Sequence, residues 1–325
     1  MKFLRTFFIS SIILFGGCDP LNEYAIEWEG EVGSEVPITI DSLTPETDVI
    51  LDVSPGEGTF VVDTGAPLTL VDTGHYNISP GYEKTDATAL GLFFPSLPVV
   101  FENIFDDSLN ISGIIGSNIV SMFNWELNYS EKYIKLHTDN LPDYFNTGSK
   151  IGFSLDGGGK FRLSTGETVD VGATRYLVKI NIEGKEILAL LDTGASYLVI
   201  TQGVLDSLPD IQRVEHGTTQ IVTVYGVMNA PLIEIDYMSF SDEYTSTRID
   251  DVYTVIVEND FFADLSWETG REISALLGGA YLQNFHLKFN LDKRLIYAQP
   301  IDAANKVKPA SGENRASVRW PIHLE

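Results

Sequence analysis

One unit occurs twice in this chain, and the duplication limits the fold more than any other feature. A Glu183-Gly184 turn separates two largely apolar stretches, Tyr176 to Ile182 and Lys185 to Leu191. The second stretch leads into Asp192-Thr193-Gly194. The same layout runs from Asp48 to Val62 and leads into Asp63-Thr64-Gly65. Short β-branched stretches separated by Gly and Pro predict β-hairpins. Each Asp-Thr-Gly is therefore expected where the second strand of a hairpin ends.

Each copy also carries a second matching segment further along the chain. One constant offset aligns Gly113-Ile114-Ile115-Gly116 with Ala275-Leu276-Leu277-Gly278, together with the apolar residues that follow each. Such self-similarity indicates tandem copies of one structural unit. Strand signals dominate the remaining sequence, and the best helix signals are short, at Asn118 to Phe123 and Ala280 to Asn284. We predict an all-β fold with two homologous β-barrel-like lobes.

The repeated Asp residues suit hydrolysis of a peptide bond. That reaction needs a general base that activates water and a general acid that protonates the leaving amine. Two carboxyls about 3 Å apart can perform both roles. At that distance both cannot be ionised at once, so the pair keeps one shared proton. A third copy, Asp72-Thr73-Gly74, has no downstream segment of its own, so we predict a strand-end turn there.

The loops Asp63-Thr64-Gly65-Ala66-Pro67 and Asp192-Thr193-Gly194-Ala195-Ser196 resemble the active-site loops of the pepsin and retropepsin clan of aspartic peptidases. The resemblance implies an active-site cleft between the lobes, Asp63 and Asp192 as the catalytic pair, and an endopeptidase that cleaves peptides or unfolded proteins without a cofactor or metal. It also assigns supporting roles to both Thr and both Gly residues of the loops and to the apolar-Gly segments. These supporting residues are Thr64, Gly65, Thr193, Gly194, Ile115, Gly116, Leu277 and Gly278.

Two departures from the pepsin pattern carry further expectations. Ala66 and Ala195 stand where pepsin-like enzymes place a hydroxyl that lowers a carboxyl pKa, so we expect activity at a less acidic pH than that of pepsin. Residues Val222 to Val227 resemble a flap tip in which Tyr225 and Gly226 cover the substrate; an ordinary turn is the alternative. In the first repeat only Leu90 to Phe94 compares with it, as a flap tip, a site wall or core.

The N-terminus predicts export and a lipid anchor. Two basic residues precede a short apolar run that ends in Leu14-Phe15-Gly16-Gly17-Cys18, which is the layout of a secretory signal. This segment resembles the lipobox of bacterial lipoproteins, with Phe15 in place of the usual Leu. The resemblance implies lipidation of Cys18 and attachment on the periplasmic side of the bacterial cell envelope, with the inner or outer membrane left open. Because Cys18 is the only cysteine, no internal disulfide is expected.

Charge and composition exclude several other classes. The formal net charge of −25 disfavours nucleic acid and anionic lipid head groups as partners. The five His residues lack metal-ligand spacing, and we expect each at the surface or in packing. With both halves in one chain, a monomer is expected.

The chain is expected to divide into a signal peptide (1–17), a tether and first strand (18–47), an N-terminal lobe (48–138), a linker (139–150), a C-terminal lobe (151–300) and a polar tail (301–325). Two alternatives to an enzyme remain. One is a catalytically silent envelope lipoprotein that binds a peptide or glycan on the same fold. The other is a structural envelope lipoprotein whose repeats form a scaffold.

Overall fold

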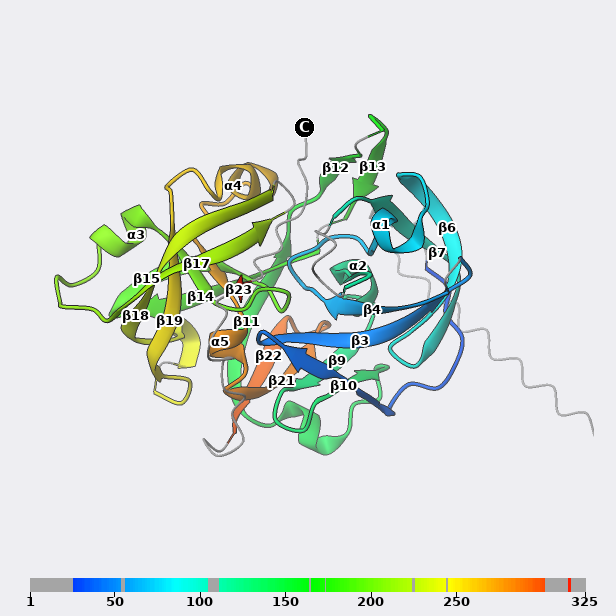
Figure 1. Cartoon of the computed structure of the whole chain (residues 1–325). Helices are drawn as coiled ribbons and strands as arrows, with labels where there is room; N and C mark the ends of the chain where they lie inside the picture. Colours follow the sequence, from blue (N-terminus) through cyan, green and yellow to red (C-terminus); the bar gives the residue numbers. More distant parts are fainter. Residues whose placement is uncertain are drawn as a thin grey trace, which may run out of the picture.

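The computed structural model describes residues 26–53, 56–104, 111–163, 165–172, 174–223, 226–243, 245–301 and 315–316. Almost all of these residues lie in strands or in the turns that join them (Figure 1). Within these ranges, no helix has the length and apolar character needed to cross a bilayer. The all-β fold is confirmed.

The first repeat forms a seven-stranded sheet in the order β2-β3-β4-β8-β5-β7-β6. Its strands are β2 (Thr39–Asp41), β3 (Thr44–Leu51), β4 (Glu57–Val62), β5 (Leu70–Asp72), β6 (Gly81–Ala89), β7 (Leu92–Glu102) and β8 (Gly113–Ile115). The edge strand β6 turns back to pair with β3 at Ile50 and Thr88, which closes the sheet into a barrel-like lobe.

The second repeat has the same pairing pattern. Its strands are β14 (Arg175–Ile182), β15 (Lys185–Leu191), β16 (Leu198–Thr201), β17 (Glu215–Thr223), β18 (Gly226–Phe240), β19 (Ile249–Val257) and β20 (Ala275–Leu277). They follow the order β14-β15-β20-β16-β19-β18, and β18 pairs back with β14. Strand β17 extends this lobe beyond β18. It has no counterpart among the described strands of the first repeat.

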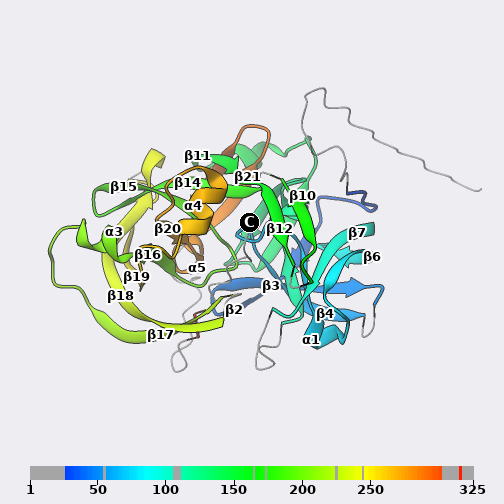
Figure 2. The same cartoon turned by 90° about the horizontal axis from the view of Figure 1, so that it is seen from above.

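A central layer joins the two lobes. Its strands are β1 (Glu35–Pro37), β9 (Asn124–Asn128), β10 (Tyr133–His137), β11 (Ser149–Asp156), β21 (Phe285–Asn290) and β22 (Leu295–Pro300). Strand β9 of the first repeat pairs with its equivalent β21 of the second, and Trp125 stacks on Phe289 at a centroid distance of 4.0 Å. Figure 1 shows β9, β10, β21 and β22 low in the view between the lobes, and Figure 2 shows the two lobes side by side from above. The buried core is continuous through it.

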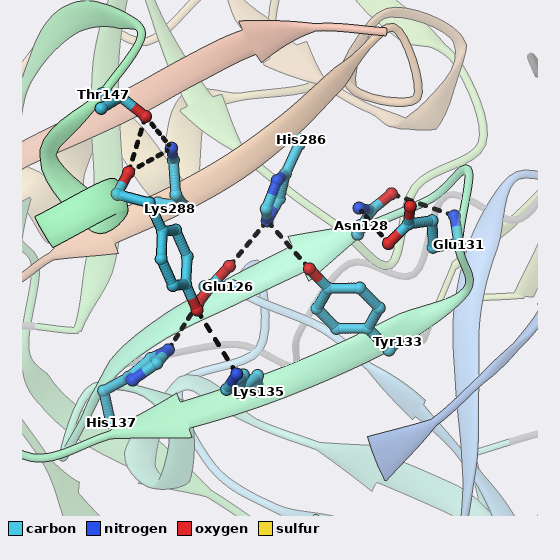
Figure 3. A network of polar contacts seen from close by, with 10 residues as sticks. Glu126, Asn128, Glu131, Tyr133, Lys135, His137, Thr147, His286 and Lys288 are labelled. Carbon is cyan, nitrogen blue, oxygen red and sulfur yellow. Dashed lines mark hydrogen bonds and ion pairs between the residues drawn. The ribbon is translucent and has the colours of Figure 1, made fainter. Parts of the chain in front are cut away.

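A buried carboxylate also ties the halves together in this layer (Figure 3). Glu126 on β9 accepts hydrogen bonds from His137 Nε2 at 2.5 Å, from His286 Nε2 at 2.8 Å and from the Tyr144 hydroxyl at 2.8 Å. Burial alone raises the pKa of Glu126, but these three hydrogen bonds outweigh it and hold the pKa well below its usual range. His137 and His286 were expected at the surface or in packing. His137 packs on Phe145 and His286 on Tyr133, and both rings also bind this carboxylate.

The remaining elements are short. The helices are α1 (Thr73–Tyr76), α2 (Ser117–Val120), α3 (Gln202–Asp206), α4 (Ala263–Thr269), α5 (Gly279–Leu282) and the 3-10 turns η2 (Asp143–Asn146) and η3 (Ser241–Glu243). The hairpin of β12 (Gly159–Arg162) and β13 (Thr168–Val171) packs Val169 and Val171 into an apolar cluster with Ala66 and Leu68 of the first repeat. Strand β23 (Arg315–Ala316) pairs with β17. The predicted short helices correspond to α2 and α5.

Residues Leu90 to Phe94 belong to the core. They form the tip of the β6–β7 hairpin, and Leu90, Leu92 and Phe94 are all buried in the main cluster. Of the three expectations for this stretch, flap tip, site wall or core, the structure shows the core. The pairings of β6 and β7 match those of β18 and β19, so Leu90 to Phe94 does not correspond to the flap-like residues Val222 to Val227. The extra strand β17, the longer β18 and helix α4 between β19 and β20 together lengthen the second repeat.

Candidate active site

Both Asp-Thr-Gly loops begin where the inner strand of a hairpin ends. Strand β4 delivers Asp63 and pairs in parallel with β8, and the Asp63 N–H donates to the Ile115 carbonyl at 3.0 Å. Strand β15 delivers Asp192 and pairs in parallel with β20, and the Asp192 N–H donates to the Leu277 carbonyl at 3.0 Å. The apolar-Gly segments thus fix the start of each loop.

The two Thr side chains lock the loops to each other. The Thr64 hydroxyl donates to the Leu191 carbonyl at 2.8 Å and accepts from the Thr193 N–H at 3.1 Å. The Thr193 hydroxyl donates to the Val62 carbonyl at 2.6 Å and accepts from the Thr64 N–H at 3.1 Å. All four bonds are buried and connect opposite repeats, so they set the separation of the two carboxyls.

Glycine is required because each loop passes directly under the other repeat's carboxyl. A Cβ atom on Gly65 would lie 2.5 Å from Asp192 Oδ2, and one on Gly194 would lie 2.4 Å from Asp63 Cγ. The Gly65 N–H donates to Asp63 Oδ1 at 2.7 Å, and the Gly194 N–H donates to Asp192 Oδ1 at 2.8 Å. These contacts show that Asp63 and Asp192 face each other.

Gly116 and Gly278 allow the supporting segments to pass close behind the loops. A Cβ atom on Gly116 would meet the Leu68 carbonyl oxygen at 2.2 Å, and one on Gly278 would meet that of Tyr197 at 2.3 Å. Just beyond these glycines, the N–H groups of Ser117 and Gly279 donate to the carbonyls of Ala66 and Ala195, both at 2.8 Å. The second half of each loop is therefore held as firmly as the first.

The surroundings favour a proton shared between the two carboxyls. Asp63 and Asp192 are fully buried. Burial, the charge of Asp63 and a hydrogen bond with Asp63 raise the pKa of Asp192 well above its ordinary value. No hydroxyl of residue 66 or 195 opposes this rise, because both residues are Ala.

The third Asp-Thr-Gly has a different role. Asp72 ends β5 and caps α1, accepting the His75 N–H at 2.9 Å and the Ile104 N–H at 2.9 Å. Thr201 caps α3 in the same way at the end of β16. The predicted strand-end location of Asp72 is confirmed, and the turn is a single helical turn.

The structure leaves some predicted site residues undescribed. Tyr225 and Cys18 lie outside the described residues, and Gly226 is described only as the first residue of β18. No cluster of three or more His, Cys, Asp or Glu with the geometry of a metal site occurs in the part of the chain that the structure describes.

Sequence reasoning missed two groups near the dyad. The charge of Arg175 lowers the pKa of Asp192. Burial raises the pKa of the Tyr129 hydroxyl, and the charge of Asp192 raises it further. Both side chains are buried, and a polar residue at the edge of an apolar stretch carries no pattern that reveals such a contact.

Comparisons with known proteins agree with this geometry. The family model described as "Aspartyl protease" matches residues 178–281, which include the second Asp-Thr-Gly loop and Leu277-Gly278. An aspartic proteinase from Irpex lacteus has a similar structure, with a TM-score of 0.52 at 10% identity over 84% of this chain and 99% of that one. Basic 7S globulin from soybean has a TM-score of 0.47 at 12% identity over 88% of this chain and 98% of that one. No curated protein sequence matches.

The chain therefore has the fold of the pepsin-like aspartic proteinases. Two duplicated lobes bring one Asp from each into contact at their junction, with an interlock of Thr residues beneath.

Proposed function

We propose that this protein is an aspartic endopeptidase in which Asp63 and Asp192 activate a water molecule against a peptide bond. The observation that carries the proposal is the mutual approach of the two carboxyls, each within 2.9 Å of the position that a Cβ would take on the other loop's glycine. Two carboxyls held this close in a buried site share one proton at mild pH. The agreement of the family model with residues 178–281 supports the same assignment.

The chemistry follows from that shared proton. The ionised carboxyl accepts a proton from water as the water oxygen attacks the carbonyl carbon of the peptide. The protonated carboxyl donates its proton to the carbonyl oxygen, which gives a diol. The carboxyl that took the proton of water then passes it to the amide nitrogen, the other carboxyl takes a proton from a diol hydroxyl, and the carbon–nitrogen bond breaks, which restores the shared proton. The Gly65 and Gly194 N–H groups each hold Oδ1 of the Asp in their own loop and so fix the orientation of the two carboxyls. No cofactor takes part in these steps.

A cleavage assay across pH tests the proposal. We expect the signal-free protein to cleave an unstructured protein with a bell-shaped pH dependence whose optimum lies above about pH 3, since no loop hydroxyl lowers the carboxyl pKa values. A peptide analogue with a hydroxyl at the scissile position should block cleavage and raise the melting temperature. Binding of peptide without any cleavage would instead indicate the catalytically silent binding protein.

We further propose that Cys18 carries a lipid anchor that holds the peptidase on the periplasmic side of a bacterial envelope. The support is the signal-like segment that ends at the only cysteine of the chain. Expressed in a bacterium, the full chain should fractionate with membranes and show an acyl-sized mass increase on its Cys18 peptide. Cys18→Ser should release it to the soluble fraction. An unmodified Cys18 in the wild type would refute the anchor without bearing on the peptidase.

A further inference from the structure

A buried cation stands at the start of the strand that pairs with the strand leading to Asp192. Arg175, the first residue of β14, is 2% exposed. Its Nε and Nη2 each lie 3.2 Å from an oxygen of Glu268 on α4. Its Nη1 is buried without a hydrogen-bond partner among the described residues. A guanidinium that uses only one side for its ion pair has its other side available to act on neighbouring groups.

The β14–β15 hairpin brings Arg175 to Asp192. The last pair of the ladder is Leu177 with Leu190, and continuing this register by two residues sets Arg175 opposite Asp192. Residues opposite each other in an antiparallel pair carry their side chains on the same face. Burial and the charge of Asp63 raise the pKa of Asp192, and the charge of Arg175 lowers it. The position of Arg175 opposite Asp192 explains this lowering.

At the equivalent position of the first repeat stands Thr44, which carries no charge. In β3 and β4 the register of Glu46 with Val61, continued by two residues, sets Thr44 opposite Asp63. Thr44 is 1% exposed, and its hydroxyl donates to the Asp41 carbonyl at 2.7 Å. The residue opposite the dyad carboxyl is therefore a cation in the second repeat and a neutral hydroxyl in the first.

We propose that Arg175 is a positioning residue for the dyad: held by Glu268 beside Asp192, it stabilises the ionised carboxyl pair and sets the pH range in which the pair works. As a statement about catalysis this rests on the proposed peptidase function. The charged and titratable groups that face this region are Asp63, Tyr129 and Glu268, together with Asp156, which is paired with Arg175 across the strands and lies 3.6 Å from Arg271.

Two substitutions should move the pH profile in opposite directions. Arg175→Met removes the cation and leaves Glu268, so both limbs of the profile should move to higher pH by about one unit. Glu268→Gln leaves the cation uncompensated, so both limbs should move to lower pH. Arg175→Lys keeps the charge and should leave the limbs near their wild-type positions even if turnover falls.

A matched pair provides the control. Arg213 binds Glu183 in the same two-pronged way, with both N–O distances at 2.8 Å, at the far turn of the β14–β15 hairpin. Arg213→Met and Glu183→Gln should leave both limbs in place. If Arg175→Met and Glu268→Gln lower the rate without moving either limb, or move both limbs in one direction, the proposal is wrong.

A second readout separates this inference from the peptidase assignment. Carbon-13 NMR of the Asp carboxyl carbons reports the titration of the dyad whether or not peptides are cleaved. Opposite shifts of that titration in a protein without cleavage would support the role of Arg175 and refute the peptidase. Cleavage with a dyad titration identical in wild type and both variants would support the peptidase and refute the role of Arg175.

Discussion

Asp63→Asn and Asp192→Asn should each reduce peptide cleavage by at least about a thousandfold, because each removes a partner in both proton transfers. An Asn keeps the oxygen that accepts the Gly65 or Gly194 N–H, so the loop geometry survives. The remaining carboxyl has no second carboxyl with which to exchange the proton. Initial rates on an unstructured protein at the wild-type optimum measure the loss.

Stability separates a catalytic loss from a folding defect. The raised pKa of Asp192 means that the folded state holds this proton more tightly than the unfolded state does. Stability from this group is therefore present at low pH and is lost as the pH rises through the folded pKa. Asp192→Asn removes that loss, so its melting temperature at neutral pH should equal or exceed the wild-type value.

The third Asp-Thr-Gly supplies the matched control for both variants. Asp72 has the same two following residues, but it caps α1 and lies outside the dyad. Asp72→Asn preserves a capping residue type and should leave the cleavage rate within about twofold of wild type. Equal losses at all three positions would indicate that the assay reports folding, and the dyad assignment would fall. Full activity in either dyad variant would also refute the dyad assignment.

The dyad loops could be predicted from sequence because their constraints are local and repeated. Only glycine fits at four positions, because a Cβ there would lie within 2.5 Å of another atom; these are Gly65, Gly116, Gly194 and Gly278. The motif also occurs once in each repeat. The hairpins could be predicted as well: the expected strands Tyr176 to Ile182 and Lys185 to Leu191 match β14 and β15 almost residue for residue. Local steric constraints and strand periodicity can both be recognised in a single sequence.

Long-range polar contacts could not be predicted in this way. Glu268 lies 93 positions from Arg175, and His286 lies 160 positions from Glu126. A lone His or Arg in an apolar strand carries no local sign of its partner. The same limit left Leu90 to Phe94 open between flap tip, site wall and core, since only strand pairing reveals that β17 is the added element.

Glu126→Ala should lower the free energy of unfolding by about 3–5 kcal/mol, the usual cost of removing one partner from a buried ionic cluster. The substitution leaves the donors of His137, His286 and Tyr144 facing a vacated space in the layer that joins the lobes (Figure 3). Glu126→Gln retains the volume and one acceptor, so it should cost less, about 1–3 kcal/mol. Chemical denaturation at neutral pH measures both.

The pH dependence of this loss identifies the carboxylate as its cause. The folded pKa of Glu126 is lowered from the ordinary value of 4.5, so its contribution is complete above that value and is lost as the pH falls through the folded pKa. The stability gap between wild type and Glu126→Gln should therefore be largest above about pH 5 and shrink progressively in more acidic solution. Glu186, whose pair with Lys179 at 2.8 Å is exposed, serves as control, and Glu186→Gln should cost less than about 1 kcal/mol. A gap that is constant from pH 5 to pH 2 would show that packing, and not charge, makes Glu126 important.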